Sequence, residues 1–163
     1  LPLIKCPLVI DADALNAIST HKNWLDILNP ETVLTPHPKE MSRLMGLATQ
    51  KIQKNRIATA SQFAADHSLT LVLKGSPSLI AMADGTVIIN PTGNAGMATG
   101  GSGDVLTGII AGLMAQGLPQ ASIAGSYIHG QAGDYFAKNE SETTLIAGDL
   151  LRSLPETLKR ILP

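Results

Sequence analysis

The chain has 163 residues and a formal net charge of −1, and only 3% of its residues are aromatic. It carries no block of Lys or Arg, which argues against a binder of nucleic acid or anionic lipid, and it lacks the aromatic platform on which single strands stack. The single cysteine excludes an internal disulfide, no Cys/His spacing fits a structural zinc site, and no apolar run has the length of a membrane span. We therefore predict one cytoplasmic domain over residues 1–163.

The first part of the chain pairs short apolar strands with helices. CPLVIDADALN indicates a buried strand, Leu8 to Asp11, that passes into a helix near Ala12. ETVLTPHPKEMSRLMG repeats this pattern, with a strand that ends at Thr35 and a helix that begins near Pro38. In the first turn of that helix the missing N–H of proline costs nothing, and Glu40 suits the positive end of the dipole.

The remaining elements continue the alternation and then become helical. A helix over about 51–66 precedes the buried strand LTLVLKG, and SLIAMADGTVIIN predicts two strands around the turn Asp84–Gly85, a hairpin signal. Only helices are expected after the glycine-rich stretch, over about 103–116, 119–138 and 147–162. Fully apolar strands that alternate with helices predict an α/β fold with a mostly parallel sheet covered by helices on both faces.

Polar or glycine-rich segments follow four of the predicted strands. In open α/β sheets, ligands bind beyond the carboxyl ends of the strands. We therefore expect the ligand site among these segments, which are Asp11–Asn16, Thr35–Glu40, Lys74–Ser78 and Asn90–Asp104.

The stretch GMATGGSGDVLTGIIAGLMAQG places four glycines within eight positions, and Asp104 follows the last of them. The P-loop pattern fails because Ser102 stands where it requires lysine, and the Rossmann fingerprint fails because Leu106 occupies its third glycine position. What remains is a glycine turn before a helix, where the free N–H groups of Gly101, Ser102 and Gly103 predict an anion site, chiefly for phosphate. The alternative is a flexible turn in which Asp104 is only a helix N-terminal acid.

Five motifs occur in the order VIDADALN, LTPHPKEMSRL, LKGSPSLIA, NPTGNAGMATGGSGDVLTGIIAGLMAQG and YIHGQAGD. The GxGD that opens an apolar helix resembles the anion-hole motif of the ribokinase-like superfamily. The whole set resembles the ADP-dependent NAD(P)H-hydrate dehydratases, a metabolite-repair family related to the carbohydrate kinases. This resemblance implies a ribokinase-like fold with an N-terminal part that this chain lacks. Since the chain begins at Leu1 without methionine, we expect the missing part to come from another piece of the same protein.

The resemblance also implies a reaction. An ADP-dependent dehydratase of this kind is a carbon–oxygen lyase that removes water from hydrated NADH or NADPH and yields NAD(P)H, AMP and phosphate. The nucleotide phosphorylates the hydroxyl of the hydrate, and phosphate then leaves. Mg²⁺ is expected to bridge the nucleotide phosphates and to keep several of its waters.

The resemblance assigns roles residue by residue. Asp104 matches the general base and a substrate contact, and His37 matches a contact to the hydrated nicotinamide nucleotide. The anion hole matches Gly101, Ser102 and Gly103, and no residue matches a metal ligand. The nucleotide-binding positions are Lys74, Gly75, Ser76, Pro77, Ser78 and Gly103.

Several of these residues also have a plainer interpretation. His37 is a loop histidine and Lys74 a strand-end lysine if the resemblance is set aside. Lys39 stands where the family usually has glycine, so its side chain either crowds the site or points to solvent. His129 lies beside Gly130 and close to Gly133, a pattern that favours close helix packing over catalysis.

Three functions stay open at this point. The dehydratase is favoured over a ribokinase-like kinase of a vitamin precursor or sugar, because such kinases often carry Asn where His37 stands. A non-catalytic nucleotide-binding remnant is disfavoured by the intact glycine turn and Asp104. We expect a homo-oligomer without nucleic-acid or membrane partners, and the sequence leaves open NADH against NADPH and ADP against ATP.

Overall fold

The computed structural model describes residues 4–29 and 31–161. The chain divides into two compact units, Leu1–Ile89 and Asn90–Pro163. The interpretation of residues 1–163 as one domain stays a prediction. Within the described residues, none of the helices combines the length and the apolar character that a membrane crossing needs.

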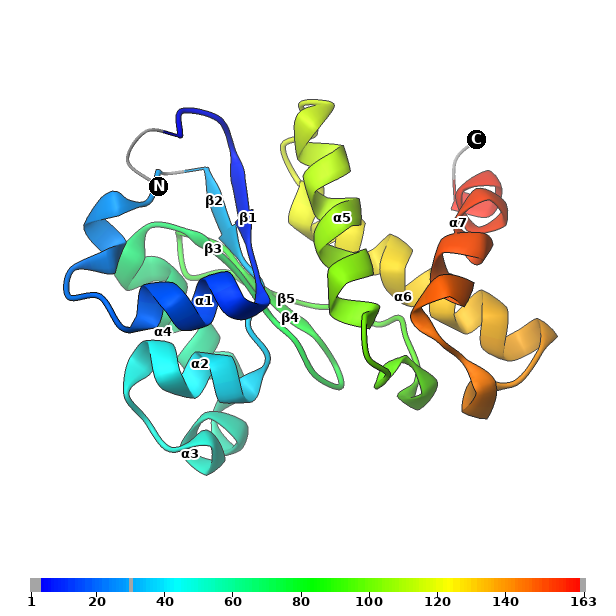
Figure 1. Cartoon of the computed structure of the whole chain (residues 1–163), viewed down its shortest axis with the longest axis horizontal. Helices are drawn as coiled ribbons and strands as arrows, with labels where there is room; N and C mark the ends of the chain where they lie inside the picture. Colours follow the sequence, from blue (N-terminus) through cyan, green and yellow to red (C-terminus); the bar gives the residue numbers. More distant parts are fainter. Residues whose placement is uncertain (1–3, 30, 162–163) are drawn as a thin grey trace. The chain divides into compact units, whose positions relative to one another are not determined.

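The first unit contains the sheet and four α-helices (Figure 1). The predicted strand-to-helix passages near Ala12 and Pro38 are both confirmed. In chain order the elements are β1 (Leu8–Ile10), α1 (Ala12–Ser19), a 3₁₀ turn (Trp24–Ile27), β2 (Thr32–Leu34), α2 (Pro38–Met45), α3 (Thr49–Lys54), α4 (Arg56–His67), β3 (Thr70–Leu73), β4 (Leu79–Ala81) and β5 (Val87–Ile89).

The sheet has the strand order β1-β2-β3-β4-β5. β1 to β3 pair in parallel, and the hairpin of β4 and β5 continues the sheet in antiparallel fashion from β3. The predicted turn at Asp84–Gly85 is confirmed, because Gly85 has φ +84° and the Asp84 carboxylate accepts the N–H of Thr86 at 2.8 Å. The parallel strands end at one edge of the sheet, which is where the polar segments were expected.

The core of the first unit is mainly aliphatic, and Trp24 and Phe63 are its buried aromatic members. Leu34, Leu71 and Leu73 are fully buried in β2 and β3, and each such side chain contributes roughly 1.5–3 kcal/mol to folding. Helix α4 packs against β3, β4 and β5, and its Ser61 hydroxyl donates to the carbonyl of Gly85 at 2.6 Å. This contact fixes the hairpin turn to the helix.

The single helix predicted over about 51–66 is wrong: the structure has two helices that meet at Asn55. Asn55 has φ −134° and ψ +42°, outside the helical region, and it closes α3 and opens α4. Asparagine has only a modest helix propensity, and the Asn55 side chain makes no capping hydrogen bond at the start of α4. Because of this break, Arg56 is the first residue of α4, and its side chain donates hydrogen bonds to the main chain that follows β3.

The second unit is helical, as predicted for the part of the chain after the glycine-rich stretch. Helix α6 packs against both α5 and α7, around a small core that includes Ala132 and Leu150. The elements are a 3₁₀ turn (Ala95–Met97), α5 (Ser102–Ala115), α6 (Ala121–Asn139), a second 3₁₀ turn (Glu142–Thr144) and α7 (Ala147–Ile161).

Candidate functional site

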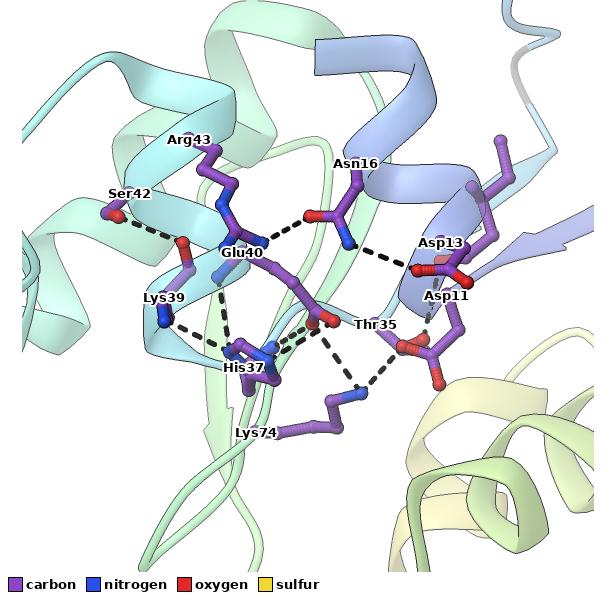
Figure 2. Close-up of polar contacts among 11 residues, drawn as sticks. Asp11, Asp13, Asn16, Thr35, His37, Lys39, Glu40, Ser42, Arg43 and Lys74 are labelled. Carbon is purple, nitrogen blue, oxygen red and sulfur yellow. Dashed lines mark hydrogen bonds and ion pairs between the residues drawn. The ribbon is translucent and has the colours of Figure 1, made fainter. Parts of the chain in front are cut away.

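Charged side chains from three segments meet at the carboxyl edge of β1, β2 and β3 (Figure 2). The Lys74 ammonium, directly after β3, donates to Asp11 Oδ1 at 2.6 Å and lies 3.8 Å from Glu40 Oε2. Their side chains are 19%, 8% and 6% exposed, respectively. Lys74 is therefore held between two buried carboxylates, and its plain interpretation as a strand-end lysine with its head in solvent is wrong.

His37 is the N-cap of α2. Its Nδ1 accepts the N–H groups of Lys39 and Glu40, each at 3.1 Å, and Glu40 Oε2 accepts the N–H of His37 at 2.8 Å, which completes a capping box. Because Nδ1 accepts two hydrogen bonds, the ring proton belongs on Nε2, which lies 3.3 Å from Glu40 Oε1. The His37 side chain is still 45% exposed, so one side of the ring remains open to a ligand.

Two further side chains border this edge. Lys39 is exposed, so of the two alternatives for this unusual lysine the structure favours the one that points to solvent. Arg43 of α2 donates to the Asn16 side chain of α1, and Asn16 in turn donates to Asp13 at 3.5 Å. These contacts tie the start of α1 to α2 beside the Lys74 cluster (Figure 2).

The segment Lys74–Ser78 is shaped by an arginine that the sequence analysis missed. Arg56 donates to three main-chain carbonyls of this part of the chain, those of Leu73, Ser76 and Pro77. Burial lowers the pKa of the Arg56 guanidinium from its ordinary value, although an arginine keeps its charge throughout the physiological range. No local signal marks Arg56, because its partners follow 17 to 21 residues later.

The predicted glycine turn forms in the second unit. Gly101 has φ +85°, the left-handed region that favours glycine, and α5 begins at the next residue. The N–H of Ser102 donates to the carbonyl of Thr99 at 3.3 Å. The prediction that this N–H is free is therefore wrong. In the described part of the unit, the N–H groups of Gly101, Gly103 and Asp104 have no main-chain acceptor.

Helix α6 carries two glycines where the stretch before α5 lies against it. A Cβ on Gly130 would collide with Thr92, and a Cβ on Gly133 would collide with the sulfur of Met97. Both contacts are closer than side chains tolerate. These glycines therefore permit close packing, although against the stretch before α5 and not against another α-helix as predicted.

The same helix holds this stretch by polar contacts. The Asp134 carboxylate accepts the N–H of Gly93 at 2.8 Å and the side-chain amide of Asn94 at 3.1 Å. His129 Nε2 lies 3.3 Å from the hydroxyl of Ser102, the first residue of α5. Thus α6 fixes the chain on the way to the glycine turn and at the start of α5.

Asp104 lies in the first turn of α5 and is exposed. A carboxylate next to free main-chain N–H groups at a helix start offers a proton acceptor beside an anion site. The described residues contain no group of three or more His, Cys, Asp or Glu side chains placed to hold a metal ion.

The fold places the chain in the ribokinase-like class. A crystal structure of a ribokinase-like superfamily protein from Enterococcus faecalis V583 matches 94% of this chain and 52% of its own chain, with 33% identity and a TM-score of 0.78. The family model described as NAD(P)H-hydrate dehydratase matches residues 3–156. The chain belongs to this NAD(P)H-hydrate dehydratase family, which confirms the resemblance seen in the motifs.

Individual relatives agree with this assignment. A bifunctional NAD(P)H-hydrate repair enzyme from Moorella thermoacetica is 50% identical over 99% of this chain. A crystal structure of an ADP/ATP-dependent NAD(P)H-hydrate dehydratase from Bacillus subtilis, co-crystallized with ATP and Mg²⁺, covers 98% of this chain with 35% identity and a TM-score of 0.87. The chain spans 31% of the length of the first protein and 57% of the second chain.

Proposed function

We propose that the protein that contains this chain dehydrates hydrated NADH or NADPH at the expense of ADP. The observation that carries the proposal is the glycine turn at the start of α5, with two free glycine N–H groups and an exposed carboxylate in one helical turn. Family membership supports the substrate, and the related ADP/ATP-dependent dehydratase from Bacillus subtilis supports the nucleotide.

In this proposal Asp104 is the general base. Its carboxylate takes the proton of the hydrate's hydroxyl group, whose oxygen bonds to the terminal phosphorus of the nucleotide as the bond to AMP breaks. Phosphate then departs with the electron pair of the carbon–oxygen bond, and loss of a neighbouring proton completes NAD(P)H. Transfer of a phosphoryl group depends mainly on positioning and charge stabilisation, which the N–H groups of Gly101 and Gly103 supply without reorganisation.

The other roles follow the resemblance. Lys74–Ser78 binds the nucleotide and His37 contacts the hydrated nicotinamide nucleotide with the exposed part of its ring. The N–H of Ser102 donates to Thr99 and its hydroxyl pairs with His129, so the free donors of the anion hole are the N–H groups of Gly101 and Gly103. Mg²⁺, when bound to the nucleotide, supplies charge neutralisation at the phosphates. The cytoplasmic location, the homo-oligomer and the N-terminal part supplied from another piece stay predictions.

The test is Asp104→Asn in the whole protein, with Glu142→Gln as the matched control. Glu142 is likewise an exposed acid in the first turn of a helical segment. As a general base Asp104 is worth roughly 10²–10⁴ in rate, whereas a helix-terminal acid contributes only about 0.3–1 kcal/mol of stability. We expect Asp104→Asn to fold and bind ADP while its turnover collapses. If it keeps more than about a tenth of the parent kcat, Asp104 is only a helix-terminal acid and this mechanism is wrong.

A further inference from the structure

We propose that Arg56 is a positioning residue for nucleotide binding: it holds the segment Lys74–Ser78 in the shape that presents a main-chain N–H to the nucleotide. This inference rests on the proposed function, because that function makes Lys74–Ser78 the nucleotide segment. It concerns a residue outside the segment itself, on the neighbouring helix α4.

The guanidinium group reaches across the segment. One terminal nitrogen of Arg56 donates to the carbonyl of Pro77 at 2.6 Å and to that of Leu73 at 3.4 Å, and the other donates to the carbonyl of Ser76 at 3.3 Å. These acceptors span the chain from the last residue of β3 to the proline. One rigid fork therefore fixes the path of the main chain at both ends of the turn.

Gly75 shows how closely the arginine lies under the segment. It has φ +154°, and a Cβ built on it would lie 2.5 Å from a terminal nitrogen of Arg56 and 2.8 Å from the guanidinium carbon. No side chain fits there unless the guanidinium moves. The closeness of Arg56 therefore explains, on steric grounds, why the motif LKGSPS has glycine at position 75.

The carbonyls held by Arg56 determine where the next N–H points. The C=O and N–H of one trans peptide point in opposite directions, so a Pro77 carbonyl that faces Arg56 turns the N–H of Ser78 to the opposite side. This N–H has no main-chain acceptor among the described residues. The Ser78 hydroxyl already donates to the carbonyl of Gly75 at 3.1 Å. The donor of Ser78 that is available to a ligand is therefore its main-chain N–H, whose direction depends on the carbonyls that Arg56 holds.

Arg56 differs from Lys74 in that its positive charge has no carboxylate partner among the described residues. Lys74 lies between the carboxylates of Asp11 and Glu40, whereas no carboxylate forms an ion pair with Arg56 anywhere in residues 4–29 and 31–161. Its Nε is buried and lacks a hydrogen-bond partner in the same part of the chain. A buried donor without a partner is costly, so the three carbonyl contacts must outweigh this cost for the arrangement to persist.

The experiment compares Arg56→Lys and Arg56→Met with Arg152→Lys, in the whole protein, by calorimetric titration with ADP and Mg²⁺. Lysine keeps the charge but has one compact ammonium group, which cannot reach all three carbonyls of a bent segment. We expect both Arg56 variants to bind ADP about tenfold or more weakly, since small misplacements of binding groups carry large penalties. The control removes an arginine that is 76% exposed and pairs with Asp149, and its affinity should equal the parent's.

Chemical rescue separates positioning from general stability. In Arg56→Ala, millimolar methylguanidinium should restore ADP affinity, and methylammonium should not, because only the former reproduces the fork. An affinity loss that matches the unfolded fraction of each variant, or rescue by both ions alike, overturns the inference. So does an Arg56→Lys protein that binds ADP as the parent does.

These titrations measure ADP binding in the absence of the hydrate, so their result does not depend on whether the proposed reaction occurs. A parent protein that binds ADP but does not dehydrate the hydrate refutes the proposed function and leaves the role of Arg56 to be decided by the variants. A parent protein that binds no ADP refutes the inference directly. Normal turnover in Arg56→Met at saturating ADP, with unchanged affinity, contradicts the inference and leaves the proposed function intact.

Discussion

Replacement of Lys74 by methionine should destabilise the protein strongly, because it leaves two buried carboxylates without their cation. The Asp11 and Glu40 side chains are 8% and 6% exposed, and Asp11 lies 2.6 Å from the ammonium. Removal of one partner from a buried pair costs about 3–5 kcal/mol. Since Lys74 itself is 19% exposed, water relieves part of this cost, and we expect a value near the lower end, about 3 kcal/mol. This is a large share of a typical unfolding free energy of about 5–15 kcal/mol.

The assay is unfolding in urea, which does not screen charges as guanidinium chloride does, with Lys159→Met as the matched control. Lys159 and Glu156 form an ion pair at 3.1 Å whose side chains are 72% and 46% exposed, so this variant should cost about 0–1 kcal/mol. Asp11→Asn in the Lys74→Met background should recover part of the loss, because it removes one of the two buried negative charges that Lys74 balances. Equal costs for Lys74→Met and Lys159→Met, within about 0.5 kcal/mol, would refute the description of this cluster as buried and coupled.

Three further substitutions probe single contacts. Gly103→Val should weaken ADP binding more than tenfold by crowding the free N–H groups at the start of α5, and equal affinity in a calorimetric titration would rule out phosphate binding there. Gly130→Ala should lower the thermal midpoint because its Cβ collides with Thr92, whereas Gly108→Ala, with open space around its Cβ, should leave it unchanged or raise it. His37→Ala should cost about 1 kcal/mol and His37→Asn much less, since Asn also caps helices. If His37 contacts substrate, both variants raise the KM for the hydrate; a KM unchanged in both leaves His37 as a cap alone.

The order of strands and helices could be predicted from the sequence because it depends on local signals. Apolar runs gave the strands, Pro38 marked the start of α2, and Asp84–Gly85 marked the hairpin turn. The break between α3 and α4 could not be predicted in this way. The residue that breaks the helix, Asn55, is tolerated in many helices and carries little weight against a favourable periodicity over the surrounding residues.

The site was predicted in part for the same reason. Lys74 and His37 were found through motifs, but the pairing of Lys74 with Asp11 joins residues 63 positions apart and depends on the register of three strands. The role of Arg56 could not be predicted because its partners are main-chain carbonyls. Every residue has a carbonyl, so no pattern of side chains in the sequence indicates these contacts. The bond from the N–H of Ser102 to Thr99 likewise depends on how the glycine turn closes.

The most direct test of the proposed function is to incubate the whole protein with hydrated NADH, ADP and Mg²⁺ and to follow the absorbance band of NADH. We expect the band to return, with one AMP and one phosphate released per NADH formed. Two results would contradict this function. One is no return of NADH from a protein that transfers phosphate to a small hydroxylated molecule, which indicates a kinase. The other is ADP binding with no transfer at all, which indicates a nucleotide-binding remnant.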